Sequence, residues 1–127
     1  DIEVNYISRA YVTRHGAGPL AHEDKFIMSD YNITDLTNQP NKWQGSLRFG
    51  LLDLDNVKQA IDKDFALWAP EGATQKRTMT CMDQLEDENV SFVQNGEGIT
   101  VSKEQFENEI VNNYDHRSYG PTVDDVV

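Results

Sequence analysis

Four segments of this chain combine side chains and backbone that can bind a polar or anionic small molecule. In the densest of them, residues 9–19 read RAYVTRHGAGP, so two arginines and a histidine flank a Gly-x-Gly turn. Glycine lets backbone amides approach a ligand closely, and arginine binds phosphate or carboxylate through paired hydrogen bonds. The candidate binding residues in this segment are Thr13, Arg14, Gly16 and Gly18. The same pattern also fits an ordinary tight turn with two surface arginines.

The second segment, residues 37–50, reads TNQPNKWQGSLRFG and gathers amide side chains around an indole and an arginine. Such a loop can surround a polar, anionic small molecule, because amides and arginine donate hydrogen bonds to its oxygens. Its candidate binding residues are Trp43, Gln44, Gly45 and Arg48. The alternative is a solvent-exposed loop in which Trp43 serves as a packing anchor. Two basic residues, Lys42 and Arg48, are too few for a nucleic-acid interface.

The third and fourth segments are residues 80–83 (TCMD) and 117–122 (RSYGPT). A carboxylate at the end of a strand, as expected for Asp83, can accept two neighbouring N–H groups from the edge of a guanine. The serine and glycine amides of the last segment can face the same kind of ring. The candidate residues in these two segments are Thr80, Asp83, Ser118 and Gly120. The alternatives are an exposed turn at Asp83 and a frayed chain end at residues 117–122.

No arrangement of residues in the sequence predicts a catalytic nucleophile or a metal site. Cys81 is the only cysteine, which excludes an internal disulfide framework and a cysteine-rich zinc site. A single cysteine is more often a small buried apolar residue than a nucleophile. His15, His22 and His116 are far apart in the sequence, and histidines scattered in this way are usually not ligands of one metal ion. We therefore assign no catalytic and no metal-binding residue.

Strands and loops must position the first two segments. Residues 4–13 are rich in β-branched and aromatic side chains and predict one strand, which ends at the glycine turn. Residues 21–46 are polar and predict an extended loop. Residues 53–65 place apolar side chains at helical spacing, and Asp53 or Asp55 is the expected N-cap of that helix.

The second half of the chain continues the alternation of strands and helices. Residues 77–82 predict a short strand, and the turn-rich stretch 86–98 holds another at residues 90–93. Ser102 begins a helix, with Gln105 three residues later as in a capping box. This alternation predicts a mixed α/β fold with three or four short strands.

The chain is expected to form a single domain, residues 1–127, because domains of this length are common. Residues 114–127 predict a loop around a Gly-Pro pair. Three or four short strands are few for a free-standing sheet. The chain also starts at Asp1 rather than at methionine, and its strand pattern begins at once. We therefore expect this domain to dock on a larger sheet.

The charge of the chain excludes two classes of partner. Lys and Arg total 11 against 22 Asp and Glu, which gives a formal net charge of −11. A nucleic-acid or anionic-membrane binder needs a cationic face, which this composition does not supply. Residues 83–127 contain only two basic residues, Lys103 and Arg117, and predict a solvated acidic face. No apolar run approaches the roughly 18 residues of a membrane span, and we expect a cytoplasmic protein.

Taken in order, the four segments resemble the last third of the adenylosuccinate synthetase family. That family carries a Lys-Ala-Tyr-x-Thr-Arg-x-Gly-Ala-Gly-Pro stretch, which residues 9–19 match except for Arg9 in place of lysine. Its Gly-Trp-Leu-Asp, Thr-Lys-Leu-Asp and Ser-x-Gly-Pro motifs correspond to residues 50–53 (GLLD), 80–83 (TCMD) and 118–121 (SYGP). The amide-rich loop and the short C-terminal region resemble the phage and archaeal-like branch, which includes 2-aminoadenylosuccinate synthetase.

This resemblance implies a ligase of purine nucleotide biosynthesis. The family joins aspartate to C6 of IMP or, in the phage branch, of a 2-amino purine monophosphate. GTP or ATP first phosphorylates the 6-oxygen, with Mg²⁺ as cofactor, and aspartate then displaces the phosphate. By the same resemblance, the first set of candidate residues borders the monophosphate and the second set closes on aspartate. The candidate residues of the third and fourth segments bind the base of the triphosphate.

The family's Gly-Asp-Glu-Gly-Lys-Gly phosphate loop, which supplies the general base and the magnesium ligand, has no counterpart in this sequence. The resemblance therefore implies a small C-terminal piece of the adenylosuccinate synthetase fold that is inactive alone and binds no Mg²⁺ itself. Its expected partners are purine nucleotides and aspartate, and an exposed sheet edge invites a homodimer or association with the missing N-terminal part. The alternative is a non-catalytic nucleotide-binding or acidic interaction module derived from that fold.

Overall fold

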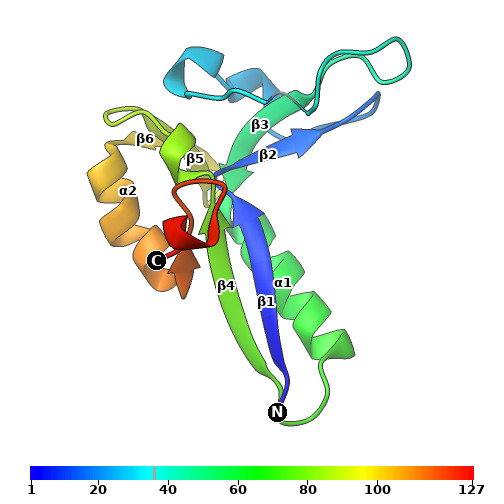
Figure 1. Cartoon of the computed structure of the whole chain (residues 1–127), viewed down its shortest axis with the longest axis vertical. Helices are drawn as coiled ribbons and strands as arrows, with labels where there is room; N and C mark the ends of the chain where they lie inside the picture. Colours follow the sequence, from blue (N-terminus) through cyan, green and yellow to red (C-terminus); the bar gives the residue numbers. More distant parts are fainter. Residues whose placement is uncertain (36) are drawn as a thin grey trace.

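The computed structural model describes residues 1–35 and 37–127, and in these residues it contains two α-helices and seven strands in two sheets (Figure 1). This is the mixed α/β fold that the alternating strand and helix patterns predict. Leu36, which falls in the loop expected at residues 21–46, lies outside the described residues. Neither described helix is long and apolar enough to cross a membrane.

The first sheet contains three parallel strands in the order β1-β4-β7, with the bounds Glu3–Arg9, Thr74–Thr80 and His116–Arg117. Helix α1 (Leu54–Trp68) packs on one face of this sheet, where Tyr6 Oη donates to Asp64 Oδ2 at 2.6 Å. Parallel sheets are usually covered on both faces. The opposite face carries Ile7, which is 69% exposed, so part of this face is open to solvent.

The second sheet contains four strands in the order β2-β3-β5-β6, with the bounds Tyr11–Arg14, Arg48–Asp53, Val90–Gln94 and Glu97–Val101. β2 and β3 are antiparallel, β3 and β5 are parallel, and β5 and β6 form a hairpin. The hairpin turn is Asn95-Gly96, and both residues have positive φ angles of 52° and 77°. This is the sequence and the conformation that two-residue hairpins favour.

Both helices begin at the residues that the sequence predicts. Asp53 caps α1 by accepting a hydrogen bond from the Asn56 amide, which confirms one of the two expected N-caps. Ser102 caps α2 (Lys103–Glu109) by accepting from the Gln105 amide. The expected capping box is only half formed, because the Gln105 side chain donates to Glu109 instead of returning to the cap.

One apolar core joins the two sheets and α2, so the strands of both sheets belong to one packed unit. Its fully buried side chains come from β3, β4, β5, α2 and the short turns after them: Leu52, Met79, Met82, Val90, Phe106 and Val111. An aromatic cluster of Tyr11, Phe26, Tyr31 and Phe49 extends this core under the long loop.

Several predicted elements were placed wrongly. Residues 4–13 form two strands in different sheets, because the chain bends at the buried residue Ala10. Residues 48–50, which we expected within a loop, begin β3 instead. The strand expected at residues 77–82 starts earlier, at Thr74, and Met82 lies in a short 3₁₀ turn. Strand β6 was not predicted, and residues 114–127 include the short strand β7.

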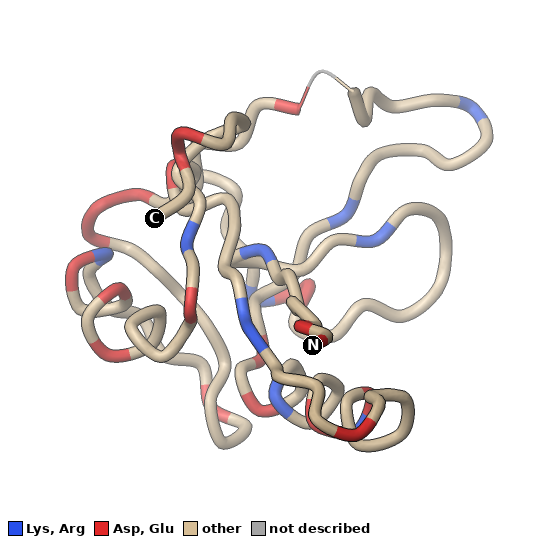
Figure 2. The backbone as a smooth tube through the Cα atoms, turned by 60° about the horizontal axis from the view of Figure 1, so that its bottom comes forward, with Lys and Arg blue, Asp and Glu red and all other residues tan. Residues whose placement is uncertain are grey.

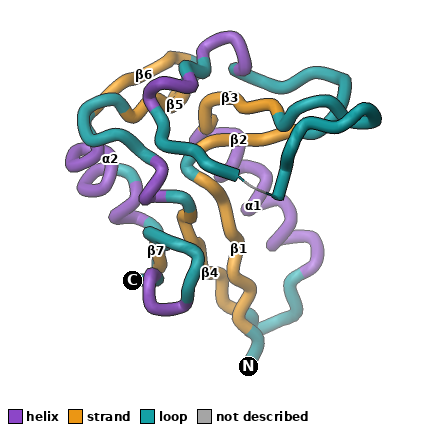
Figure 3. The backbone as a smooth tube through the Cα atoms, turned by 45° about the horizontal axis from the view of Figure 1, so that its top comes forward, coloured by secondary structure: helices purple, strands orange, loops and turns teal. Residues whose placement is uncertain are grey.

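A long connection between β2 and β3 carries most of the glycine turn and the amide-rich segment. Figure 3 shows these loops projecting beyond β2 and β3. Two short 3₁₀ turns, Glu23–Lys25 and Met28–Asp30, are the only helical pieces in the described part of this connection. The polar composition of residues 21–46 therefore predicted its irregular structure.

The acidic residues are distributed over the surface rather than gathered at one point. Figure 2 shows acidic positions recurring along α1 and α2 and on the loops around them. In α1, one of these carboxylates has two basic partners: Asp62 accepts from Lys58 and from Arg77. The net charge of −11 opposes close approach of two such chains until salt screens it.

Candidate functional site

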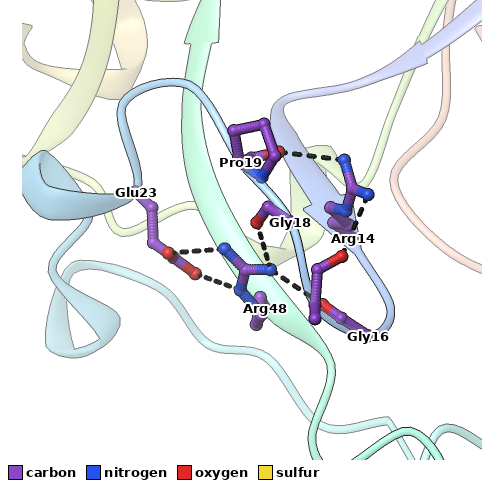
Figure 4. Close-up of polar contacts among 7 residues, drawn as sticks. Arg14, Gly16, Gly18, Pro19, Glu23 and Arg48 are labelled. Carbon is purple, nitrogen blue, oxygen red and sulfur yellow. Dashed lines mark hydrogen bonds and ion pairs between the residues drawn. The ribbon is translucent and has the colours of Figure 1, made fainter.

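The glycine turn between β2 and β3 is held by two arginines that face each other across the strand pair (Figure 4). The guanidinium of Arg14 donates to Pro19 O at 2.9 Å and to Ala17 O at 3.0 Å. Arg48 donates from Nη1 to Gly16 O at 2.7 Å and to Gly18 O at 2.8 Å. The turn therefore presents carbonyl groups to both arginines, which fixes its shape.

The backbone angle of Gly18 and the nearby Arg14 side chain both favour glycine at this position. The φ angle of Gly18 is +115°, which side-chain-bearing residues rarely adopt, and a Cβ atom there would lie 2.5 Å from Arg14 Nη2. Gly16 has a positive φ of 75°, but a Cβ atom there would contact nothing within 4 Å. The two candidate glycines thus differ in purpose: Gly16 permits the turn, and Gly18 also admits the guanidinium of Arg14.

Arg48 also forms a two-pronged ion pair with Glu23. Its Nε donates to Glu23 Oε2 at 2.7 Å and its Nη2 donates to Oε1 at 2.8 Å. The hydrogen bonds from Arg48 hold the pKa of Glu23 below its ordinary value. With the turn carbonyls and Glu23 together, four of the five N–H groups of Arg48 are occupied. A ligand carboxylate can accept two hydrogen bonds from Nε and Nη2 of this guanidinium only by displacing Glu23.

The other candidate residues of the amide-rich segment, Trp43, Gln44 and Gly45, form a tight turn. The Asn41 side chain accepts from the Trp43 and Gln44 amides, both at 2.9 Å, and Gly45 pairs with the Asn41 backbone. The Trp43 side chain is 83% exposed, with the Lys42 ammonium 4.7 Å from its ring centroid. The structure therefore places Trp43 on a projecting tip rather than as a packing anchor.

Asp35 ties the amide-rich segment to the glycine turn through Asn38. Asp35 Oδ1 accepts from Thr37 Oγ1 at 2.7 Å and from the Thr37 amide at 2.9 Å, and it also accepts from Asn38. These hydrogen bonds hold the pKa of Asp35 well below its ordinary value. Asn38 Oδ1 lies 3.0 Å from His15 Nε2. The first two candidate segments are thus in contact, as a shared binding site requires.

Thr80, Ser118 and Gly120 line one hollow of about 450 Å³ on the open face of the parallel sheet. The hollow lies where β4 and β7 end, and Ser118 links the two: its amide donates to Met79 O at 2.9 Å. Ser118 Oγ donates to Gly120 O at 2.9 Å, so the chain-end loop is ordered against this face. The alternative of a frayed chain end at residues 117–122 is therefore not what the structure shows.

The lining of this hollow combines polar and apolar residues. Asn5, Thr78 and His116 line it together with the candidate residues. The apolar lining residues come from β1 and from the chain-end loop: Ile7, Pro121, Val123 and Val126. Asp83 is not among the lining residues; it is exposed in the short turn after Cys81. The structure thus brings three of these four predicted residues together.

A second hollow, of about 330 Å³, lies beside the glycine turn and contains a pair that sequence reasoning missed. Thr13 and Arg14 line it together with His22 and Asp53. His22 Nε2 lies 3.0 Å from Asp53 Oδ2, while the other oxygen of Asp53 caps α1. His22 and Asp53 are 31 residues apart, so no spacing in the sequence could reveal the contact. The Asp53 carboxylate can hold the imidazole in one orientation.

The protonation of Asp53 reflects these contacts. Burial raises the pKa of Asp53, but hydrogen bonds from the Asn56 amide and from His22 outweigh it, and the pKa lies below its ordinary value. The described residues contain no group of three or more His, Cys, Asp or Glu side chains that could hold a metal ion. The arrangement can therefore bind polar ligands and orient an imidazole.

Comparison with protein-family models, with curated proteins and with solved structures finds no match for this chain. The fold and the two hollows are therefore the basis on which its function is inferred.

Proposed function

We propose that this chain is the C-terminal region of an adenylosuccinate synthetase-like ligase, and that it contributes nucleotide-binding and aspartate-binding loops to the full enzyme. The observation that carries the proposal is the hollow shared by Thr80, Ser118 and Gly120. These residues come from two motifs 38 positions apart, and they meet at the carboxyl ends of parallel strands. Ligands of open α/β sheets bind at that edge.

In this proposal, the hollow takes the purine ring of the nucleoside triphosphate. Its lining offers donors and acceptors from Thr80, Thr78 and Asn5, which suit the polar edge of a base. Its apolar lining residues, among them Ile7 and Val123, suit the flat face of the ring. The glycine turn at Thr13 and Arg14 borders the monophosphate, beside the second hollow.

Arg48 and the Trp43 turn serve aspartate in this proposal. Glu23 already binds Arg48 in the two-pronged geometry that a substrate carboxylate would use. Aspartate would replace Glu23 in that position, while the exposed Trp43 tip moves over it.

The reaction itself needs groups that this sequence does not supply. A general base and a phosphate cradle must come from a phosphate-binding loop on another stretch of polypeptide. The described residues do not fit a Mg²⁺ site, since no cluster of carboxylates faces either hollow. No catalytic step is therefore assigned to the metal on this chain.

Nucleotide binding by the 127-residue chain tests this proposal. We expect GTP or ATP to bind in isothermal titration, with no turnover of IMP and aspartate. Thr80→Val should weaken binding about tenfold, because it removes a hydroxyl from the lining of the hollow. Thr74→Val is the matched control, since Thr74 begins the same strand and is exposed. Equal weakening by both variants, or turnover by the chain alone, would contradict the proposal.

A further inference from the structure

The Arg48 guanidinium presents two edges to two different partners (Figure 4). Its Nη1 donates to Gly16 O and to Gly18 O, so the glycine turn holds one edge in place. Its Nε and Nη2 form the other edge, where both carboxylate oxygens of Glu23 accept hydrogen bonds. Arginine binds carboxylates in general with this paired geometry. The edge that could bind a ligand is therefore already oriented, and an internal carboxylate occupies it.

The glycine turn does not require this carboxylate. Arg14 holds the same turn through Pro19 O and Ala17 O, and within the described residues it has no acidic partner. The bonds from Arg48 to the turn come from Nη1 and do not involve the edge that Glu23 occupies. The turn therefore keeps Arg48 in place when Glu23 leaves.

Glu23 is bound through its side chain by Arg48 alone. In the described part of the chain, neither of its carboxylate oxygens accepts a hydrogen bond from another residue. The 3₁₀ turn Glu23–Lys25 contains no buried residue, and the Glu23 side chain is 40% exposed. A carboxylate from solution that takes its place breaks two hydrogen bonds and forms two of the same kind. The exchange is therefore close to balanced in free energy.

We infer that Glu23 is a built-in competitor for the substrate carboxylate at Arg48, and that it lowers the affinity of the chain for this substrate. The inference rests on the proposed function, which assigns this edge of Arg48 to aspartate. The ligand is a carboxylate rather than a phosphate, because the edge already holds a planar group with two oxygens. Only those molecules in which Glu23 has left Arg48 bind the ligand, so the apparent dissociation constant rises in proportion.

Binding of L-aspartate to the 127-residue chain tests this inference. The Nε–H resonance of Arg48 is followed by nuclear magnetic resonance as L-aspartate is added to the unsubstituted chain, to Glu23→Ala and to Glu23→Gln. Glu23→Ala should bind L-aspartate about tenfold more tightly than the unsubstituted chain, because no internal carboxylate competes. Glu23→Gln should have an intermediate affinity, since its amide offers one acceptor oxygen and no charge. The glutamine variant also decides the question if the alanine variant does not fold.

Asp24→Asn is the matched control. Asp24 is the next residue in the chain, is exposed, and pairs with no basic group within the described residues. The substitution removes the same charge as Glu23→Gln but leaves Arg48 paired, so the affinity for L-aspartate should not change. An equal gain in affinity from Asp24→Asn would overturn the inference, because general repulsion would then account for it. Tighter binding of inorganic phosphate than of L-aspartate by Glu23→Ala would also overturn it.

The outcomes separate this inference from the proposed function. Equal affinity for L-aspartate in the unsubstituted chain and in both Glu23 variants, read at Arg48, would overturn the inference alone. No binding of L-aspartate by any variant would overturn the inference together with the aspartate-binding role of this loop. A gain in affinity in Glu23→Ala without nucleotide binding at the end of β4 would support the inference and contradict the nucleotide-binding part of the proposed function.

Discussion

Arg14 and Arg48 hold the glycine turn from two sides and satisfy carbonyl groups that would otherwise face water. The turn is therefore shaped by its own arginines before any ligand arrives. Arg48 is also paired with Glu23, so its availability to a ligand depends on that carboxylate. The two arginines that could bind an anion, Arg14 and Arg48, are therefore also the residues that hold the glycine turn in place.

Alanine substitutions separate the two glycines of the turn. Gly18→Ala should lower the free energy of unfolding by about 2 kcal/mol or more, because it adds a strained φ angle and a close contact with Arg14. Gly16→Ala should cost about 1 kcal/mol, since only the left-handed conformation is penalised. Urea unfolding measures both. A larger effect at Gly16 would contradict the packing described for Gly18.

The His22–Asp53 pair predicts an acid-dependent loss of stability. The pKa of Asp53 is lower in the folded state, so its contribution is present above the ordinary value near pH 3.9 and is lost as the pH falls through the folded value. Asp53→Asn should therefore destabilise the protein by about 1 kcal/mol at pH 6 and by less at pH 2.5.

The control for this pH dependence is Asp24→Asn. Asp24 is exposed and makes no side-chain hydrogen bond or ion pair within the described residues. In urea unfolding, the free energy of unfolding of Asp24→Asn should equal that of the unsubstituted protein at both pH values. The loss of unfolding free energy caused by Asp53→Asn could instead stay constant or grow on acidification. That result would show that His22 and Asn56 do not stabilise the charged carboxylate.

The two helix caps are the features of the elements that can be tested most directly. Ser102→Ala should lower the free energy of unfolding by about 1 kcal/mol, because the Gln105 amide loses its acceptor. Gln105→Ala should cost only a few tenths of a kcal/mol, since that side chain reaches Glu109 and not the cap. Equal losses in thermal unfolding would indicate a complete capping box instead.

The helix starts could be predicted because the capping residues lie next to them in the sequence. The strands were harder to predict because they depend on pairing with segments far away in the sequence. Asp53 and Ser102 each lie within three residues of the amide that they cap. By contrast, nothing around Ala10 distinguishes a bend from a continuing strand, and burial in the core decides it. β3 becomes a strand because it lies between β2 and β5, which are distant in sequence.

The candidate site likewise contains residues that the sequence identified and a pair that only the structure shows. The family resemblance assigned Thr80, Asp83, Ser118 and Gly120 to one binding set, and in the structure Thr80, Ser118 and Gly120 line one hollow. Asp83 lies outside that hollow, because the turn after Cys81 directs it to solvent. His22 and Asp53 meet only through the long connection, so their pairing is a tertiary property.

At the scale of the whole molecule, the β1-β4-β7 sheet has one edge strand that is paired with the end of the chain and one that is not. Its β7 edge is closed by the end of the chain, and its β1 edge and part of one face are open. That face contains the larger of the two hollows. The hollow proposed to bind the nucleotide thus lies on the face of this sheet opposite α1.

A titration followed by nuclear magnetic resonance tests the central claim most directly. The isotope-labelled chain of 127 residues is titrated separately with GTP and with ATP, and the backbone amide shifts are followed. We expect the largest changes at Thr80, Ser118 and Gly120, with Thr74 unaffected. Saturating shifts confined to other surfaces, or none with either nucleotide at millimolar concentration, would contradict a purine-binding hollow at the end of β4.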